Sequence, residues 1–307
     1  MAFSMHVPPF YDLLRSVHAW VYPDIQPVPE FTWEGAFARL FTIGDARTPV
    51  VVSQSSAGRP LHVDFEDDSI NRAAVRRKVR KVLGLDIDTG GALACIARNP
   101  VIHGTESQVR GIRPYIADTV FEALIKSIVQ QQISYRAASV ITKRIVAGFA
   151  VPSLFKEHLL YPFPDHKTIL SAGESKLAEI GLGFKARYVH EVCSMVARGV
   201  LEPEGLAGRT ADAAREVLGS IKGIGDWTLN ALAVSGLGDF SVFPYSDIGM
   251  RNLLGRLHKH GERLSEAEVR ELASSWGTDG PLVLYLLMCA DVLGAISQAR
   301  RSKTHKR

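Results

Sequence analysis

A series of short helical segments, separated by glycine and proline, begins at about Gly111 and limits the fold most strongly. The first is VFEALIKSIVQQQ, where Thr119 and Glu122 predict a capping box ahead of the helix. Its apolar residues at helical spacing are Phe121, Leu124, Ile125 and Ile128. The later segments are YRAASVITKRIVAGF, ESKLAEIG, GLGFKARYVHEVCSMVARG, ADAAREVLGS, DWTLNALAVSG, SDIGMRNLLGRL, SEAEVRELASSW and PLVLYLLMCADVLG. The pattern predicts a mainly α region over 111–300.

The residues before this region, 1–110, predict an α+β domain. RPLHVDFE alternates apolar and polar residues with the period of a half-buried strand, and PVVVSQ before it predicts the partner strand of a hairpin in an antiparallel sheet. SINRAAVRRKVRKVLG then predicts a helix, for which Asp67, Asp68 and Ser69 are candidate N-caps. At the other end, 301–307 form a basic tail.

The helix predicted over 69–83 has one strongly basic side. The residues of that side are Arg72, Arg76, Arg77, Lys78, Arg80 and Lys81. A solvated face is the favoured interpretation, and a surface that contacts phosphates is the alternative. The pattern alone leaves contact with DNA open.

Composition excludes several classes of protein. The 307 residues are 46% apolar and 22% charged with a net charge of +4, which permits an anionic partner without requiring one. The cysteines Cys95, Cys193 and Cys289 are far apart in sequence, which excludes a disulfide framework, a structural zinc site and a four-cysteine iron–sulfur cluster. The N-terminus shows no secretion signal, and the longest apolar run is too short for a membrane span. We therefore expect a cytoplasmic protein without a membrane partner.

A glycine turn, Gly223-Ile224-Gly225, joins two of the predicted helices. A dinucleotide-binding loop is rejected, because a helical pattern precedes the turn and Thr228 stands where the third glycine is needed. A purely structural connector between helices remains an equal alternative to a functional turn. In the functional interpretation, the first backbone N–H groups of DWTLNALAVSG form an anion site for a phosphate. Lys222 adds charge there, although a lysine in a turn is more often merely solvated.

A second feature follows in DFSVFPYSDIGMRNLLGRL, where Asp247 ends a proline-containing loop and opens a helix. Taken alone, Asp247 is most simply an N-cap. The whole arrangement, however, resembles the helix-hairpin-helix DNA glycosylase superfamily (HhH-GPD) over about 111–294. The segments that carry the resemblance are FEALIKSIVQQQIS, GLGFKARYV, LGSIKGIGDWTLNAL and VFPYSDIGMRNLL. Within the superfamily the chain is most similar to the 3-methyladenine DNA glycosylase II (AlkA-like) branch, whose members also carry an N-terminal α+β domain.

The resemblance implies roles for individual residues. Asp247 would be the catalytic carboxylate, and Trp227 stands where a lysine forms a Schiff base in members that also cleave the DNA backbone. The chain should therefore be monofunctional, without AP-lyase activity. A side chain at Gln132, with Ile133 beside it, would fill the gap left by the extruded base. The remaining expected DNA contacts are Lys222, Gly223, Gly225 and Thr228. The carbonyls of Gly219, Ile221 and Ile224 would hold a structural Na⁺ or K⁺, and no other cofactor is expected.

The predicted base pocket lies between two helical lobes. Trp227 offers a face on which a cationic base can stack, and a core tryptophan is the alternative. Met288 and Cys289 are late-helix positions expected to line the pocket, where some relatives have aromatic residues, while Ala231 stands where the family often has an aromatic residue. Four further aromatic residues are candidates for the pocket, although a core position is favoured for each: Tyr285, Trp276, Phe184 and Tyr188.

The mechanism expected is base flipping followed by hydrolysis. A buried, ionised Asp247 would stabilise the positive charge that develops on the sugar and orient the attacking water. The leading hypothesis is a monofunctional DNA glycosylase that excises alkylated (3-methyladenine-type) bases from damaged double-stranded DNA in base-excision repair. The alternatives are a glycosylase of the same fold for oxidised or deaminated bases, and a non-catalytic module that binds damaged DNA. A monomer is expected, associated with the nucleoid if the source is bacterial.

Overall fold

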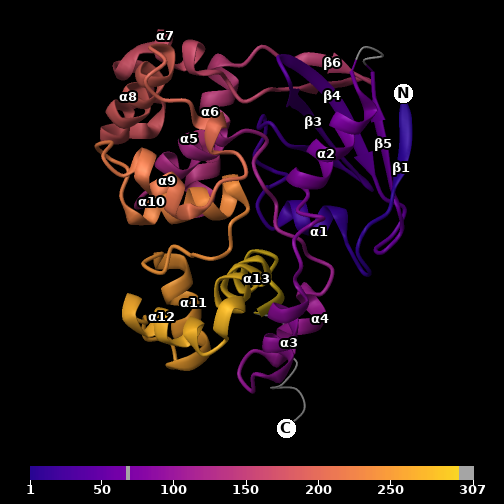
Figure 1. Cartoon of the computed structure of the whole chain (residues 1–307), viewed down its shortest axis with the longest axis vertical. Coiled ribbons are helices and arrows are strands. Elements are labelled where there is room, and N and C mark those ends of the chain that lie inside the picture. The colour runs from indigo at the N-terminus through magenta and orange to yellow at the C-terminus, as the bar shows by residue number, and fades with distance from the viewer. Residues whose placement is uncertain (67–69, 297–307) are drawn as a thin grey trace.

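The computed structural model describes residues 1–66 and 70–296 of the chain (Figure 1). The candidate N-caps Asp67, Asp68 and Ser69 lie outside the described residues, as do the basic tail at 301–307 and the predicted end of the helical region at residue 300.

An antiparallel sheet of five strands forms the N-terminal part of the molecule. The strands run in the order β1-β5-β4-β3-β2, and β3 pairs with β4 from Ala36 opposite Ser53 to Ile43 opposite Ala46. Their bounds are Ala2–Met5 (β1), Phe31–Trp33 (β2), Ala36–Ile43 (β3), Ala46–Ser53 (β4) and Leu61–Phe65 (β5). In β5 the apolar residues are buried and the polar ones are not, so the alternation predicted for RPLHVDFE is confirmed.

Two helices and a small hairpin cover this sheet. The helices α1 (Leu13–His18) and α2 (Arg72–Val82) share one hydrophobic core with the sheet. The hairpin β6 (Ser153–Phe155) and β7 (His158–Leu160) packs on the other face through Phe155 and Leu160. Each sheet face is therefore buried against a different part of the chain.

The basic helix α2 begins at Asn71, whose side chain accepts a hydrogen bond from the Ala73 N–H at 2.8 Å. Much of its basic side has partners within the protein. The guanidinium groups of Arg72 and Arg76 lie 5.0 and 4.8 Å from the ring centre of Phe3, within reach of a cation–π interaction. These contacts favour the structural interpretation of this face over contact with phosphates.

The middle of the chain forms one helical lobe, which we call the hairpin lobe. Its helices share a single core and surround α5. Their bounds are Val120–Gln130 (α5), Tyr135–Phe149 (α6), His166–Leu177 (α7), Ala186–Ala197 (α8), Ala211–Leu218 (α9) and Asp226–Leu232 (α10). Short π- or 3₁₀-helical turns add Ala178–Leu182, Gly183–Lys185, Pro203–Leu206 and Ala233–Leu237.

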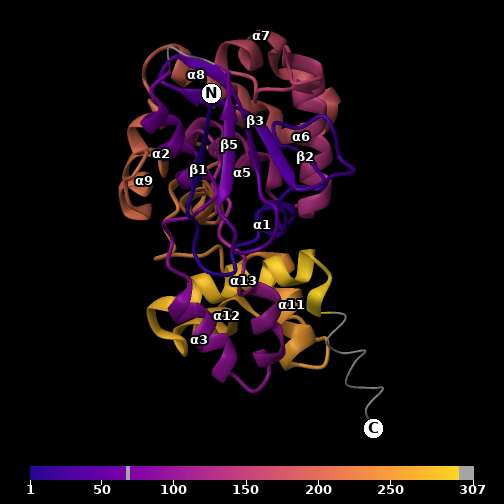
Figure 2. The ribbon, with the colours of Figure 1, turned by 90° about the vertical axis from the view of Figure 1, so that its right-hand side faces the viewer.

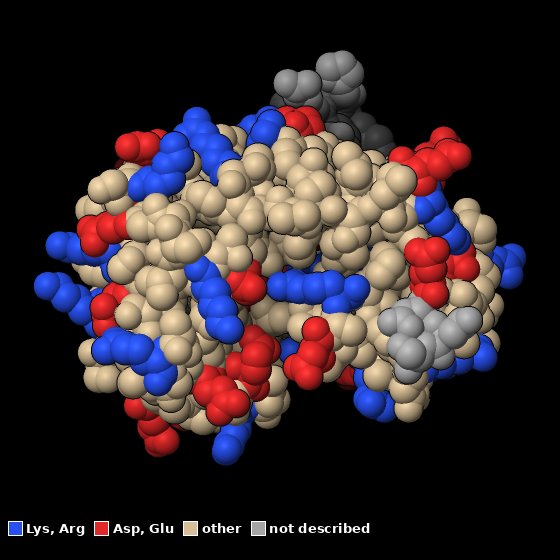
Figure 3. Space-filling view, turned by 90° about the horizontal axis from the view of Figure 1, so that it is seen from above, with Lys and Arg blue, Asp and Glu red and all other residues tan. Residues whose placement is uncertain are grey.

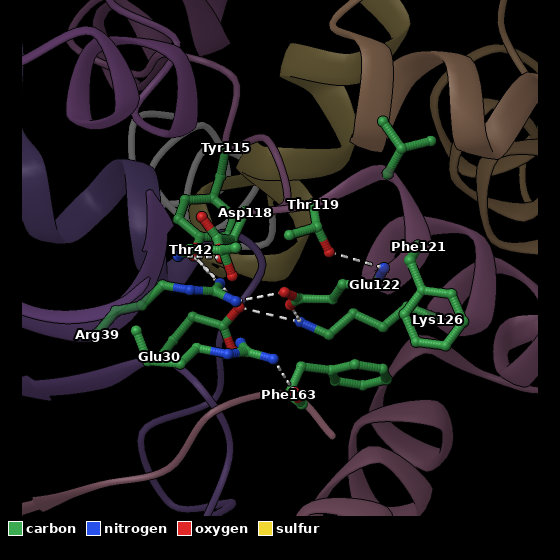
Figure 4. A network of polar contacts seen from close by, with 12 residues as sticks. Glu30, Arg39, Thr42, Tyr115, Asp118, Thr119, Phe121, Glu122, Lys126 and Phe163 are labelled. Atoms are coloured by element: carbon green, nitrogen blue, oxygen red, sulfur yellow. Dashed lines mark hydrogen bonds and ion pairs between the residues drawn. The ribbon is translucent and has the colours of Figure 1, made fainter. Parts of the chain in front are cut away.

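The capping box predicted for α5 is half correct. Thr119 is the N-cap, and its hydroxyl accepts a hydrogen bond from the Glu122 N–H at 3.1 Å (Figure 4). The Glu122 side chain does not return to Thr119. It forms ion pairs with Arg39 of β3 and Lys126 of α5 instead. A buried arginine and a half-buried lysine compete for this carboxylate more strongly than one backbone N–H does.

The last helices form a second lobe, which we call the C-terminal lobe. It contains α11 (Ile248–His258), α12 (Glu266–Ser274) and α13 (Gly280–Val292), with the turn Gly277–Asp279. The helices α3 (Gly90–Arg98) and α4 (Glu106–Val109), with the turn His103–Thr105, pack against α13 and share its core (Figures 1 and 2). The domain boundary predicted at residue 110 therefore does not coincide with a boundary between hydrophobic cores.

The predicted fold class is confirmed: the chain is mainly helical, with an N-terminal antiparallel sheet. Within 1–66 and 70–296, no helix is both long enough and apolar enough to cross a bilayer. Figure 3 shows the end of the molecule near α7 and β6, where acidic and basic side chains are interspersed. Among the described residues, this end has no large positively charged patch of the kind that binds DNA.

Candidate active site

A cleft of about 1000 Å³ opens between the hairpin lobe and the C-terminal lobe, and the N-terminal segment closes one side of it. Many of the residues singled out in the sequence line this cleft. They are Gln132, Ile133, Gly223, Ile224, Gly225, Trp227, Thr228, Ala231, Tyr285, Met288 and Asp247. Lys222 is exposed beside the turn, and Gly219, Ile221 and Cys289 do not line the cleft. The fold thus brings the candidate carboxylate and the candidate base platform to one cavity.

Asp247 is held at the start of α11 by its own capping geometry. Its Oδ1 accepts a hydrogen bond from the Met250 N–H at 2.9 Å, and its backbone N–H donates to the Pro244 carbonyl at 2.8 Å. The buried Asn230 of α10 donates to the Phe243 carbonyl at 3.2 Å, which ties this loop to the hairpin helix. Asp247 is half-buried rather than buried as predicted, because it lines an open cleft.

Trp227 lies in the first turn of α10 and faces the same carboxylate. Its indole Nε1–H donates to Asp247 Oδ2 at 3.3 Å. The side chain is half-buried and lines the cleft, so the alternative of a core tryptophan is wrong. A flat aromatic surface beside a carboxylate can stack on a base while the carboxylate faces the sugar.

Of the two glycine positions in the hairpin turn, only one requires a glycine for steric reasons. Gly223 has φ +92°, and a Cβ there would lie 2.4 Å from the ring of Tyr188, so the position requires glycine. Gly225 is the N-cap of α10 with ordinary φ, and a Cβ there would meet nothing within 4 Å. Gly223 therefore shapes the turn, while Gly225 leaves its backbone open to an approaching molecule.

Gln131, which sequence reasoning passed over, locks the hairpin to the end of α5. Its amide donates to the Gly223 carbonyl at 2.7 Å and to the Thr228 hydroxyl at 2.9 Å. Thr228 is only 2% exposed and its hydroxyl accepts from Gln131, so the geometry does not favour the DNA contact predicted for it. The run QQQ gave no signal that its second glutamine faces inward.

Gln132 and Ile133 lie at the junction of α5 and α6, where both are exposed at the cleft. Gln132 has φ +60°, a left-handed conformation that non-glycine residues seldom adopt. Lys185 supports this junction, since its ammonium donates to the carbonyls of Val129 at 2.6 Å and Gln131 at 3.1 Å. Burial lowers the pKa of Lys185. The strained corner is thus fixed from behind.

The carbonyls expected to hold a monovalent cation lie in the turn between α9 and α10. The Ile221 carbonyl already accepts a hydrogen bond from the Ile224 N–H at 3.0 Å, which leaves its second lone pair free. Neutral carbonyl oxygens suit Na⁺ or K⁺, so the donor set fits such an ion. Within the described parts of the chain, no group of three or more His, Cys, Asp or Glu side chains gathers into a metal site.

The far wall of the cleft is aromatic, and two of its members were missed in the sequence. Tyr285 is 2% exposed, and its ring stacks on that of Trp20 at 5.0 Å and 28°. Tyr135 meets Trp20 edge-on at 5.2 Å and 87°. All three line the cleft. Trp20 comes from a segment over 200 residues from α13 in sequence, so no local pattern could have indicated it.

Of the remaining residues predicted for the pocket, some line the cleft and others lie in the core. Met288 lines the cleft, whereas Cys289 is buried behind it, where burial raises the pKa of its thiol. Trp276 is in the core as favoured. The core interpretation is wrong for Phe184, which is 54% exposed. Tyr188 is partly buried against the core of the hairpin lobe and also lines the cleft. Both come from the segment GLGFKARYV, whose glycine turn brings aromatic rings to the surface.

Comparison with known families adds to this geometry. The model of the HhH-GPD superfamily, described as base excision DNA repair proteins, matches residues 125–278, half of the chain. The chain belongs to this superfamily. The matched residues run from α5 past α12 and include the hairpin turn, Trp227 and Asp247. The superfamily expected from the motifs is confirmed.

Relatives within the superfamily carry related names. A DNA-3-methyladenine glycosylase of Bacillus subtilis is 24% identical over 244 residues, which cover 78% of this chain and 80% of that protein. The structure of a 3-methyladenine DNA glycosylase from Archaeoglobus fulgidus matches with a TM-score of 0.81 at 28% identity, over 95% of this chain and 98% of that one. The expected resemblance to 3-methyladenine glycosylases is thus confirmed.

A more distant structure shares the fold alone. An 8-oxoguanine glycosylase/lyase of Clostridium acetobutylicum matches with a TM-score of 0.72 at 17% identity, over 95% of this chain and 97% of that one. One fold therefore hosts proteins named for different lesions, and the choice of substrate must be argued from the site.

Proposed function

We propose that the chain is a monofunctional DNA glycosylase that excises alkylated bases from duplex DNA in base-excision repair, acting as a monomer. The observation that carries the proposal is the contact between Trp227 and Asp247 at the wall of the cleft, 3.3 Å from indole nitrogen to carboxylate oxygen. The names of the relatives from Bacillus subtilis and Archaeoglobus fulgidus support the choice of lesion.

The first step brings the base into the cleft. Extrusion costs a few kcal/mol and is cheapest for a damaged base, whose pairing is already weak. Gln132 and Ile133 lie exposed at the mouth of the cleft, where they are suited to fill the gap left in the duplex. The strained backbone at Gln132, backed by Lys185, keeps this wedge rigid while the base is out of the stack.

The second step breaks the bond between C1′ and the base nitrogen. Positive charge develops on the sugar as the bond lengthens, and Asp247 stabilises that charge electrostatically. A water molecule adds to C1′, with Asp247 orienting it and accepting its proton. The base leaves with the electron pair of the broken bond. An alkylated purine is cationic before the reaction and leaves as a neutral molecule, so it needs no general acid.

Lyase activity is not expected because the residue at the position of the Schiff-base lysine is Trp227. An indole has no nucleophilic amine to attack C1′, so the reaction ends with an abasic site. In place of an amine, Trp227 presents a π-face to the base, and an electron-rich ring attracts a cation more than a neutral base. The same residue thereby supports both the hydrolytic outcome and the preference for alkylated bases.

The hairpin turn would grip the DNA backbone. Gly225 leaves the first N–H groups of α10 open, and α10 carries no side-chain cap. Lys222 is exposed beside the turn, and Gly223 gives the turn its shape. The carbonyls of Gly219, Ile221 and Ile224 would hold a monovalent cation, which supplies positive charge for a phosphate. These contacts ignore base sequence, as a repair enzyme requires.

A panel of duplexes tests the proposal. Each duplex carries one defined lesion, namely an N-alkylated purine, 8-oxoguanine, hypoxanthine or uracil, and alkali reveals abasic sites after incubation. We expect excision of the alkylated base above all others. Excision of only an oxidised or deaminated base would contradict the choice of substrate. Binding without any excision would contradict the enzyme and leave a damaged-DNA-binding module.

A further inference from the structure

Four charged side chains, two of each sign, gather between the sheet and α5, three of them buried and Lys126 half-buried (Figure 4). They are Glu30, Arg39, Glu122 and Lys126. Arg39 pairs with both carboxylates, and so does Lys126, at 3.0 Å from Glu30 and 2.6 Å from Glu122. The set is balanced in charge, which offsets much of the cost of removing the four groups from water.

The two carboxylates of this set differ in what they face. Glu30 and Lys126 line the cleft, whereas Glu122 does not. Glu122 is 1% exposed and Glu30 is 3% exposed, so both are buried against the protein. One end of the ion network therefore reaches the cavity in which the base is expected.

Glu30 uses one carboxylate oxygen for all of its ionic contacts. Its Oε1 accepts hydrogen bonds from Arg39 at 2.9 Å, Lys126 at 3.0 Å and the Tyr115 hydroxyl at 3.2 Å. Its Oε2 accepts no hydrogen bond within 1–66 and 70–296, and it is not among the polar atoms sealed from solvent. Because Glu30 and Lys126 both line the cleft, a molecule there can meet two parts of the network, the Oε2 acceptor of Glu30 and the ammonium donor of Lys126.

Glu30 is connected to the aromatic wall of the cleft. Tyr115 donates its hydroxyl to Glu30 and its backbone N–H to the Tyr285 hydroxyl, at 3.0 Å for the latter. Tyr135 also lies near Glu30. Burial of the Tyr135 phenol raises its pKa most, and the charge of the Glu30 carboxylate raises it as well. This side of the pocket thus combines aromatic walls with the Glu30 carboxylate as an acceptor, a combination typical of sites that orient a ligand by a few polar contacts.

We propose that Oε2 of Glu30 accepts a hydrogen bond from the exocyclic amino group of the extruded base, and thereby selects amino-bearing bases over bases with a carbonyl oxygen at that position. The proposal rests on the proposed function, since it assigns specificity within the same site. An ion-paired carboxylate has acceptors only, so a base that presents an amino group gains a bond, while a carbonyl oxygen there meets a like partial charge. Alkylated adenine and cytosine carry such an amino group, whereas hypoxanthine has a carbonyl oxygen at the same position.

The variant Glu30→Gln gives an unusual test, because its amide has a defined orientation. The three groups around Oε1 are all donors, so the amide oxygen takes that place and the NH₂ group takes the place of Oε2. The cleft then presents a donor instead of an acceptor. We expect the preference for amino-bearing bases over keto bases to be lost.

The matched control is Glu122→Gln. It removes the same charge from the same network and the same partners, but from a side chain that does not line the cleft. Both variants are compared with the unaltered protein on two duplexes, one with an alkylated adenine and one with the corresponding alkylated hypoxanthine. In the hypoxanthine a carbonyl oxygen replaces the exocyclic amino group, and the neighbouring ring nitrogen carries a hydrogen. The measured quantity is the ratio of the two single-turnover excision rates.

We expect the unaltered protein and Glu122→Gln to favour the amino base by at least about 10-fold, and Glu30→Gln to lower the ratio by about 10-fold or more. An unchanged ratio in Glu30→Gln, or an equal change in Glu122→Gln, would overturn the assignment. If Glu30→Gln does not fold, Glu30→Asp keeps the charge but withdraws the oxygen, and the same ratio must fall. Failure of the unaltered protein to excise either base would contradict the proposed function instead.

Discussion

The indole N–H of Trp227 and the carboxylate of Asp247 lie in hydrogen-bond contact at 3.3 Å, so the first turn of α10 is joined to the start of α11. Trp227 belongs to the hairpin lobe and Asp247 to the loop that enters the C-terminal lobe. The contact therefore joins the two lobes at the wall of the cleft. It places the base platform and the charge-stabilising group at a fixed separation before any DNA arrives.

The first prediction concerns the stacking surface. Trp227→Ala should lower the single-turnover excision rate of an alkylated base by about 10- to 100-fold, because stacking on an aromatic face contributes about 1–3 kcal/mol. Trp227→Phe should retain more activity, since it keeps a ring and loses only the contact with Asp247. Trp33→Ala is the control, as Trp33 packs against His158 away from the cleft. Equal rates in Trp227→Ala and the unaltered protein would contradict the stacking role.

The second prediction concerns the chemical outcome. Borohydride added during excision should trap no covalent adduct between protein and DNA, because Trp227 provides no amine for a Schiff base. The same reaction treated with alkali should show abasic sites, which proves that excision took place. A trapped adduct would show a second nucleophile and end the monofunctional proposal.

The third prediction separates the two glycines of the hairpin. Gly223→Ala should destabilise the protein by about 1–3 kcal/mol, since the new methyl group meets the Tyr188 ring at positive φ. Gly225→Ala should leave stability within about 1 kcal/mol, because nothing lies within 4 Å, yet it should weaken DNA binding by crowding the backbone. Urea unfolding and binding to a duplex with an abasic site measure the two effects. Gly225→Ala with undiminished DNA binding would argue against the phosphate grip.

The fourth prediction follows from the buried network. Burial alone would raise the pKa of Glu122, but Arg39 and Lys126 together have the larger opposite effect. The net result is a pKa of about 2, below the ordinary value of 4.5. A depressed pKa contributes stability that is present above the unfolded value and is lost as the pH falls through the folded value. The unfolding free energy should therefore decline as the pH falls from about 5 to about 2, by at most about 3 kcal/mol from this group.

The matching variant is Glu122→Gln, which removes the titrating group. Its unfolding free energy should decline less steeply over the same range of pH, although it starts lower because Arg39 and Lys126 lose a partner. Denaturant unfolding at several pH values measures both slopes. An equally steep decline in the variant would mean that Glu122 does not carry this acid sensitivity.

The helical part of the fold was predictable because its signals are local. Apolar periodicity marked α5, the glycines marked the hairpin, and a lone aspartate after a proline loop marked the start of α11. Asp247 and Trp227 could be assigned roles from these patterns together with the family resemblance. Their mutual contact could not, since it depends on how two lobes meet.

The acidic and aromatic side of the cleft was not predictable. Trp20, Glu30 and Tyr115 come from the N-terminal part and its connection to α5. They meet in the cleft through contacts between distant positions, such as that of Tyr115 with Glu30, 85 positions apart. The partners of Glu122 show the same limit, because a local capping pattern was overridden by a buried arginine from β3. Long-range packing decides both features, and no periodicity in the sequence encodes it.

The most direct measurement of the central claim is the single-turnover excision rate of Asp247→Asn on a duplex with one alkylated base. Asparagine caps a helix as well as aspartate does, so α11 should stay intact. Asp226→Asn is the control, since Asp226 opens the neighbouring helix α10 but pairs with Arg215 and does not line the cleft. We predict a loss of at least about 100-fold for Asp247→Asn, with DNA binding retained, and little change for the control. Undiminished excision by Asp247→Asn would contradict the account.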